Sequence, residues 1–188
     1  MTAQSVTDAV VAWFQPPAVV GLNELGPGIP WFEDGSAWRL DSQLGWGAIG
    51  FVHRSHESER RIAYGGTTSG IKQVVYDVAI VLLFKYLIGR DQDIQNTSQA
   101  YVPCLNQLLD GMKDRLRADR TLGTAPGISG LGGIQIAPGG SILQAGEGDG
   151  SGAADVTIDR DYPRRDKQGG TIWSWNDFTF QVVEMVNT

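Results

Sequence analysis

The sequence predicts an α+β protein in which an antiparallel β-sheet carries two helices on one face and is interrupted by long glycine-rich loops. Three observations support this prediction: a long apolar run from Val74 to Leu87, alternating segments on either side of it, and an apolar stripe at helical spacing after residue 103. A chain of 188 residues with 41% hydrophobic content is long enough to bury a core as a single domain, 1–188.

The apolar run predicts one long central strand over 72–87. Every second residue from Val74 to Tyr86 is apolar, and the opposite face is apolar in the middle, with Asp77 and Lys85 towards its ends. Side chains alternate across a strand, so one face is expected to be fully covered. A helix also fits a continuous apolar run, but the Val, Ile and aromatic content favours a strand. Because it exceeds the usual ~5–6 residues, we expect it to project past the core and to offer Asp77 and Lys85 to neighbouring subunits.

Shorter alternating segments predict the rest of the sheet. A strand hairpin is expected over 48–64, with strands on either side of a polar turn at Ser55–Arg60. The short connection to the long strand then indicates an antiparallel meander. The alternation over 171–186 predicts a strand near the end of the chain.

Two helices are predicted over 5–14 and 103–118. Ser5 is a suitable N-cap and Pro16 ends the first helix. Pro103 suits the first position of the second helix, after a polar link over 91–100. Its apolar stripe consists of Leu105, Leu108, Leu109, Met112 and Leu116. A stripe of this kind is expected to pack on the apolar face of the sheet, together with the first helix.

Glycine, at 25 residues, concentrates in two loop-rich regions. The first covers 16–46 and contains Trp31, Trp38 and Trp46, which either bind a glycan or protein or pin the loop to the core. The second covers 123–170 and is predicted to hold a glycine-rich hairpin, with short strands at 134–137 and 142–144, another short strand at 155–158, and a charged loop.

The charged loop contains Asp159, Arg160, Arg164, Arg165 and Lys167. It is either a solvated tip or a docking arm that pairs charges with a neighbouring protein. The sequence does not choose between these two interpretations.

Catalytic and metal-binding patterns are weak. His53 and His56 have no third ligand at a recognisable spacing, Cys104 is isolated, and a single Gly-Asp-Gly-Ser-Gly segment does not make a calcium-binding repeat. Nothing assembles a nucleophile, a base and an oxyanion site. We therefore predict a protein that is not an enzyme and that binds no cofactor or metal.

The net charge of −6 argues against a protein that grips nucleic acid, because such proteins neutralise phosphates with basic patches. The longest apolar run contains Asp77 and Lys85 and is shorter than the ~20 residues of a membrane span. The N-terminal residues lack the order of a signal peptide, so the chain is expected to be made in the cytoplasm.

The order of these elements resembles the tail terminator proteins of long-tailed, siphovirus-like bacteriophages. Four segments carry the resemblance: VTDAVVAWF (6–14), KQVVYDVAIVLLFKYL (72–87), PCLNQLLDGMKDRL (103–116) and WNDFTFQVVEMV (175–186). The loops over 21–45 and 124–170 are longer than in the smallest members of that family.

The resemblance implies a ring-forming virion protein of the tail and neck. It would assemble as a homohexamer on the last ring of the tail tube protein, end tube polymerisation and contact the head-completion (stopper) protein, while DNA passes through without specific binding. Three alternatives stay open: another connector, stopper or tube component; a glycan- or protein-binding module using the loop tryptophans; and a small enzyme whose site the sequence does not display.

Overall fold

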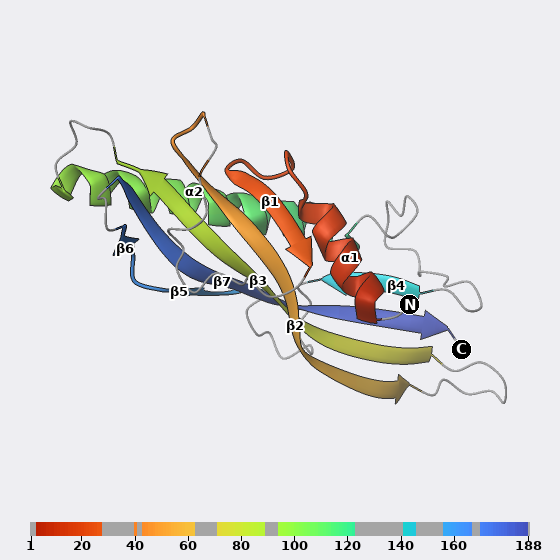
Figure 1. The fold of residues 1–188 in the computed structure, drawn as a ribbon. Coiled ribbons are helices and arrows are strands. Elements are labelled where there is room, and N and C mark those ends of the chain that lie inside the picture. The colour runs from red at the N-terminus through yellow and green to blue at the C-terminus, as the bar shows by residue number, and fades with distance from the viewer. Residues whose placement is uncertain are drawn as a thin grey trace.

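The computed structural model describes residues 3–27, 40, 43–62, 71–88, 94–122, 141–145, 156–166 and 170–187. One long twisted sheet runs through the molecule, and both helices lie along it (Figure 1). In chain order the elements are α1 Ala3–Phe14, β1 Leu22–Pro27, β2 Trp46–Ile62, β3 Ile71–Leu87, α2 Ile94–Ala118, β4 Ser141–Ala145, β5 Thr157–Arg160, β6 Arg164–Arg165 and β7 Thr171–Asn187.

The predicted long strand is the centre of the sheet. The strand order is β1-β2-β3-β7-β4, and β5 and β6 also pair with β7. Strand β3 pairs antiparallel with β2 on one side and with β7 on the other over its whole length. The predicted α+β class and the central strand over 72–87 are therefore confirmed, as is the strand over 171–186.

The sheet is mixed rather than wholly antiparallel, because β1 pairs parallel with β2. The loop predicted over 16–46 thus contains a strand that the sequence did not reveal. Only Leu22 and Leu25 are buried in β1, a bulge interrupts its register after Leu22, and Pro27 ends it. Two buried residues in six, out of strict alternation, give too weak a pattern to predict a strand.

The predicted turn at Ser55–Arg60 is wrong, since β2 continues through it to Ile62. The hairpin that forms is between β2 and β3, in register from Trp46 opposite Tyr86 to Ile62 opposite Ile71. The polar and charged residues suggested a turn, but Ser55–Glu59 continue the strand with their side chains exposed on both faces. Because β1 pairs with β2 only as far as Val52, the rest of β2 is also an edge among the described residues.

The second helix begins earlier than predicted. Helix α2 starts at Ile94, so the polar link predicted over 91–100 is helical from that residue, and Pro103 lies inside the helix. A proline removes one backbone hydrogen bond from a helix. The buried Tyr101 packs its ring edge-on against Phe84 of β3, with 5.2 Å between ring centroids, which holds this first part of α2 against the sheet.

Both helices pack on the face of β3 that carries its even-numbered residues, as predicted. That face is buried from Val74 to Phe84 and joins the apolar residues of α1 and α2 in one core. Phe14 of α1 meets Phe178 of β7 edge-on, at 6.3 Å between centroids. The helices also contact each other, because Trp13 Nε1 donates to the Arg115 carbonyl at 3.2 Å and the Arg115 guanidinium stacks on the Trp13 ring at 3.7 Å.

The opposite face of the sheet has a smaller apolar cluster. Ile49, Leu83 and Trp173 are buried there, with Phe51 and Trp175 partly buried beside them. The expected strands at 142–144 and 155–158 correspond to β4 and β5, both paired with β7. The strand expected at 134–137 lies outside the described residues.

Candidate functional site

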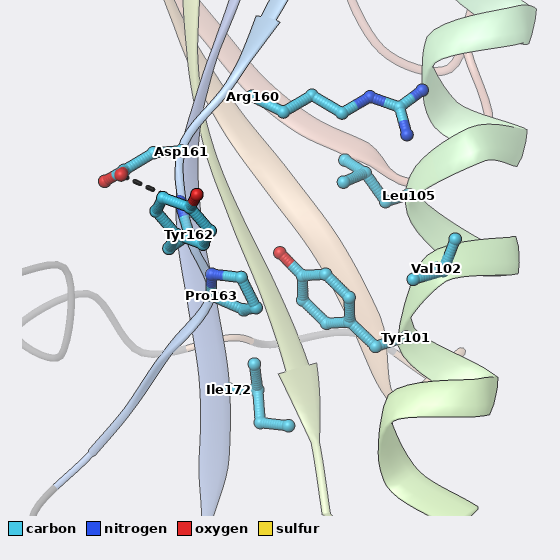
Figure 2. Close-up of a pocket in the computed structure, with 8 residues that line it drawn as sticks. All are labelled: Tyr101, Val102, Leu105, Arg160, Asp161, Tyr162, Pro163 and Ile172. Carbon is cyan, nitrogen blue, oxygen red and sulfur yellow. Dashed lines mark hydrogen bonds between the residues drawn. The ribbon is translucent and has the colours of Figure 1, made fainter.

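A surface cavity of about 300 Å³ lies between the first part of α2 and the segment that joins β5 to β6. Its walls are largely apolar, and Figure 2 shows residues of α2 facing Tyr162 and Pro163 across it. The lining residues are Tyr101, Val102, Leu105, Arg160, Asp161, Tyr162, Pro163 and Ile172.

The helical wall is fixed by Tyr101. Its ring packs on Phe84, and its hydroxyl shares a short hydrogen bond with the hydroxyl of Ser174 on β7. Both contacts are buried, so they fix the position of this turn of α2 relative to the sheet. The next residue, Val102, consequently faces outwards and is 47% exposed, which places an apolar side chain at the mouth of the cavity.

The opposite wall is a short segment tied to β7 at both ends. Strand β5 before it and β6 after it each pair with β7. Between them, the Asp161 carboxylate accepts a hydrogen bond from the Tyr162 backbone at 2.7 Å and forms an ion pair with Arg164 at 3.1 Å. This local arrangement fixes the backbone of Tyr162, whose side chain is 88% exposed.

Arg160 is the charged group of the cavity that forms no ion pair with another described side chain. It lies opposite Asn176 in the β5–β7 register, and its side chain extends towards α2 (Figure 2). Within the described residues no hydrogen bond or ion pair holds its guanidinium. Burial raises the pKa of the Tyr101 hydroxyl, while the positive charge of Arg160 acts in the opposite direction. A guanidinium in this position is available to a carboxylate that enters the cavity.

Beneath the cavity wall lies a buried polar cluster. The Asn176 amide donates to the Ser174 hydroxyl at 2.8 Å, and Ser174 in turn contacts Tyr101. The amide oxygen of Asn176 is buried without a hydrogen-bond partner among the described residues. Buried polar groups normally have hydrogen-bond partners, so the Asn176 amide oxygen is an exception among the described residues.

Four of the seven residues predicted at an interface come together in the β5–β6 region. Asp159 and Arg165 are exposed, Arg160 lines the cavity, and Arg164 forms the ion pair with Asp161 and stacks over Trp173 at 5.3 Å. Lys167 lies outside the described residues. The ion pair between Asp161 and Arg164 therefore helps to order the charged loop, while Arg160 extends towards α2 and Arg165 is exposed.

The other two predicted interface residues lie apart from this region. Asp77 accepts a hydrogen bond from Gln181 across the β3–β7 pair at 2.9 Å and is half-buried. Lys85 is only 2% exposed, on the face that also buries Trp173, so its charge is not presented at the surface of the single chain. Seven residues lie between Asp77 and Lys85 along β3, and the two side chains do not form a common site.

A pair of like charges faces outwards across the β5–β7 register. Asp159 lies directly opposite Asp177, and both side chains are exposed. Partial desolvation raises the pKa of the Asp177 carboxyl, and the negative charge of Asp159 adds to the effect. Like charges directly opposite each other in a sheet are destabilising.

Other residues singled out in the sequence have structural positions. Trp46 is 7% exposed and packs against Phe84, so it is not available as a glycan platform, and Trp31 and Trp38 lie outside the described residues. His53 and His56 lie on β2 on either side of a bulge. Among the described residues, no group of three His, Cys, Asp or Glu side chains is placed to hold a metal ion.

Sequence reasoning missed the apolar half of the cavity. Val102 was placed neither in the polar link over 91–100 nor in the helix from Pro103, and Tyr162 and Pro163 were treated as part of a charged loop. The signal that could have identified Tyr162 and Pro163 is an aromatic residue beside a proline within a charged segment. A charged, solvated loop does not need a large apolar side chain, so its presence indicates a contact.

Comparisons with known proteins give no family assignment. No family model matches the chain, and no curated protein matches it. None of the helices in the described part of the chain is long and apolar enough to span a membrane.

Proposed function

We propose that this chain is a structural protein of a long-tailed bacteriophage, a tail terminator that closes the tail tube as a homohexameric ring and joins it to the head-completion protein. The order of elements supports this proposal, together with one structural observation: among the described residues, the outer half of β2 pairs with β3 and with no strand on its other side. Its residues Ser55–Glu59 are exposed on both faces, and in Figure 1 the ends of β2 and β3 extend beyond the helices.

An exposed strand edge is a means of joining subunits. Its outward N–H and C=O groups can pair with a strand of another chain, and this is the geometry of β-augmentation. A ring requires a heterologous contact in which one surface of each subunit meets a different surface of the next. The outer half of β2 supplies one such surface, and the charged β5–β6 segment near the other end of the sheet supplies a second surface for a tube or stopper protein.

The acidic character of the chain suits a channel for DNA. With a net charge of −6, the ring would repel phosphates rather than bind them, so DNA could pass without specific contacts. In this proposal the protein is made in the host cytoplasm and resides in the neck of the virion, with no cofactor.

The first experiment measures mass by light scattering and inspects tail tubes by negative-stain microscopy with and without the protein. The expected result is a hexameric ring, or a cap at one end of each tube. A protein that stays monomeric and also leaves both tube ends bare would contradict the proposal.

A pair of proline variants tests the β2 edge directly. Adjacent residues of a strand direct their N–H groups to opposite sides, so one of Glu57→Pro and Ser58→Pro breaks a bond to β3 and the other blocks only the outer edge. The variant that keeps the wild-type melting temperature should lose ring and cap formation, whereas Glu57→Ala and Ser58→Ala should keep it. Normal capping of tail tubes by that proline variant would show that the outer edge of β2 does not join the subunits.

The β5–β6 segment needs a variant that leaves its internal ion pair intact. Arg165→Glu reverses an exposed charge without touching the pair between Asp161 and Arg164. We expect weaker joining of heads to tails with Arg165→Glu and normal joining with Arg117→Glu, an exposed arginine on α2. Equal joining by the two variants would show that the segment does not dock.

A further inference from the structure

The cavity between α2 and the β5–β6 segment has the features of a receptor for one side chain of another protein. We propose that it binds an acidic segment of a partner protein, with an aromatic or branched apolar side chain in the cavity and the adjacent carboxylate on the guanidinium of Arg160. This inference rests on the proposed function only in that an assembly protein needs such a partner.

The size of the cavity limits the group that enters it. A volume of about 300 Å³ is at the lower end of the ~300–1,000 Å³ of small-molecule pockets. An aromatic ring or a branched aliphatic group fits such a space, and the walls it would touch are the apolar side chains of Leu105, Pro163 and Ile172.

The residues at the mouth of the cavity favour a side chain of a bound protein over a free small molecule. Val102 and Tyr162 are two of the large apolar side chains that the described surface exposes, and they lie on opposite walls, from elements far apart in the sequence. Both line the cavity, and the part of their apolar surface that stays exposed would be covered by the flanking residues of a bound segment. Exposed aromatic residues around a pocket are typical of protein interfaces.

Charge complementarity decides the chemistry next to the apolar group. The guanidinium of Arg160 reaches across the cavity towards α2, and no described residue forms a hydrogen bond or ion pair with it. The nearby Asp161 does not neutralise it, because that carboxylate is engaged by Arg164 and by the Tyr162 backbone. A carboxylate would form a charge-assisted, bidentate hydrogen bond with Arg160.

A second copy of this chain does not offer the complementary segment on its described surface. The large exposed apolar residues there are Val20, Leu44, Leu87, Val102 and Tyr162. Only Tyr162 has an acidic neighbour in the sequence, and that neighbour, Asp161, is already paired. The described surface of a second copy therefore does not supply the segment, so the proposal takes a different protein as the occupant, and the dependence on protein concentration described below tests a second copy.

Capped peptides and two-dimensional ¹H–¹⁵N NMR of the full chain test the proposal. The peptide acetyl-Gly-Phe-Asp-Gly-amide should shift the amide signals of Val102, Leu105 and Tyr162 in a saturable manner. Replacing Phe by Ala in the peptide should abolish the shifts, and replacing Asp by Asn should weaken binding by about tenfold, as expected for the loss of one charge-assisted hydrogen bond.

Two protein variants assign the contact to the cavity. Arg160→Gln should raise the Kd for the Phe-Asp peptide by about tenfold. Arg165→Gln, which removes an exposed arginine outside the cavity lining, should leave the Kd within about twofold, because an exposed charge contributes little. Equal affinity of wild-type protein and Arg160→Gln, or of the Phe-Asp and Phe-Asn peptides, would overturn the proposal.

Two further measurements distinguish the alternative occupants. Free 3-phenylpropionate that binds more tightly than the peptide would make the cavity a small-molecule site. The same amide shifts on raising the protein concentration alone would make it a contact between copies. Either result overturns the proposal, and neither depends on ring formation, so failure here and failure of the proposed function can be told apart.

Discussion

The two halves of β2 differ, although they belong to one continuous strand. From Ala48 to Val52 the strand lies between β1 and β3, and most of its side chains are buried. From Ser55 to Glu59 it pairs only with β3 among the described residues, and all of its side chains are exposed. Apolar and glycine residues occupy the first half, and polar and charged residues the second. Pairing with β3 alone is therefore enough to keep β2 extended. Burial of its side chains occurs only where β1 and the helices also cover the sheet.

The largest effect is expected in the inner part of the sheet. Leu82 of β3 lies opposite Gly50 in the buried half of β2 and is fully buried beneath the helices. Leu82→Ala removes buried methyl groups and leaves a cavity, so the free energy of unfolding should fall by about 2–5 kcal/mol. Urea denaturation followed by circular dichroism measures this, and a loss below about 1 kcal/mol would mean that the inner half is loosely packed.

The next effect concerns the outer part of β3, where the central strand is still buried. The Tyr76 hydroxyl donates to the Glu184 carboxylate at 3.0 Å, and both side chains are buried. Tyr76→Phe leaves a buried acceptor without this bond and should lower the free energy of unfolding by about 1–3 kcal/mol. Tyr162→Phe, at an exposed tyrosine, is the control and should change little.

The same tyrosine predicts a dependence of stability on alkaline pH. Burial raises the pKa of Tyr76 above its ordinary value, and the hydrogen bond and negative charge of Glu184 add to this. Because the folded state holds the proton more tightly, stability is lost as the pH rises above the ordinary tyrosine pKa of about 10. Tyr76→Phe should lose less stability than wild type over that rise, and parallel curves would contradict the assignment.

A smaller, stabilising effect is expected at the paired carboxylates of β5 and β7. Asp177→Asn removes the repulsion from Asp159 and should raise the free energy of unfolding at neutral pH by about 0.2–1 kcal/mol. The pKa of Asp177 is raised in the folded state, so its ionised form is unfavourable and the wild type gains stability as the pH falls through that pKa. The advantage of the variant should shrink on acidification. An advantage that grows would reverse this interpretation.

The smallest effect is expected at the outer half of β2. Glu57→Ala removes an exposed side chain that pairs with Arg54 at 3.0 Å on the surface of the strand. Because surface ion pairs contribute little, the free energy of unfolding should change by no more than about 0.5 kcal/mol. Thermal melting against wild type measures this change. A loss near that of Leu82→Ala would erase the distinction between the two halves.

The sequence predicted the elements that are apolar along a whole face. The alternation from Val74 to Tyr86 and the stripe from Leu105 to Leu116 give β3 and the greater part of α2, because burial along one face imposes a period on the sequence. The extent of β2 could not be predicted in this way. Its outer half is held by backbone pairing with β3, and backbone hydrogen bonds impose no period on the side chains.

Of the candidate site, the sequence predicted the charged residues but not the apolar ones. Arg160 and Arg165 were singled out as interface residues, and the structure places both in the β5–β6 region. The cavity depends on the register of β5 and β6 against β7, and on a helix that begins at Ile94 rather than at Pro103. Such long-range pairings leave no local signature in the sequence. That α2 and the charged segment lie side by side could therefore not be predicted from the sequence alone.

The position of β7 has a consequence for synthesis on the ribosome. Strands β4, β5 and β6 all pair with β7, which follows them in the sequence, and β7 also covers the full length of β3. Until β7 has emerged, those three short strands and one long edge of β3 lack the partner with which they pair in the described part of the sheet. The sheet therefore closes in a late step that joins distant parts of the chain, and contacts of this kind make folding slow. During that interval the nascent chain exposes an apolar edge, which would be protected by the ribosome or by a chaperone.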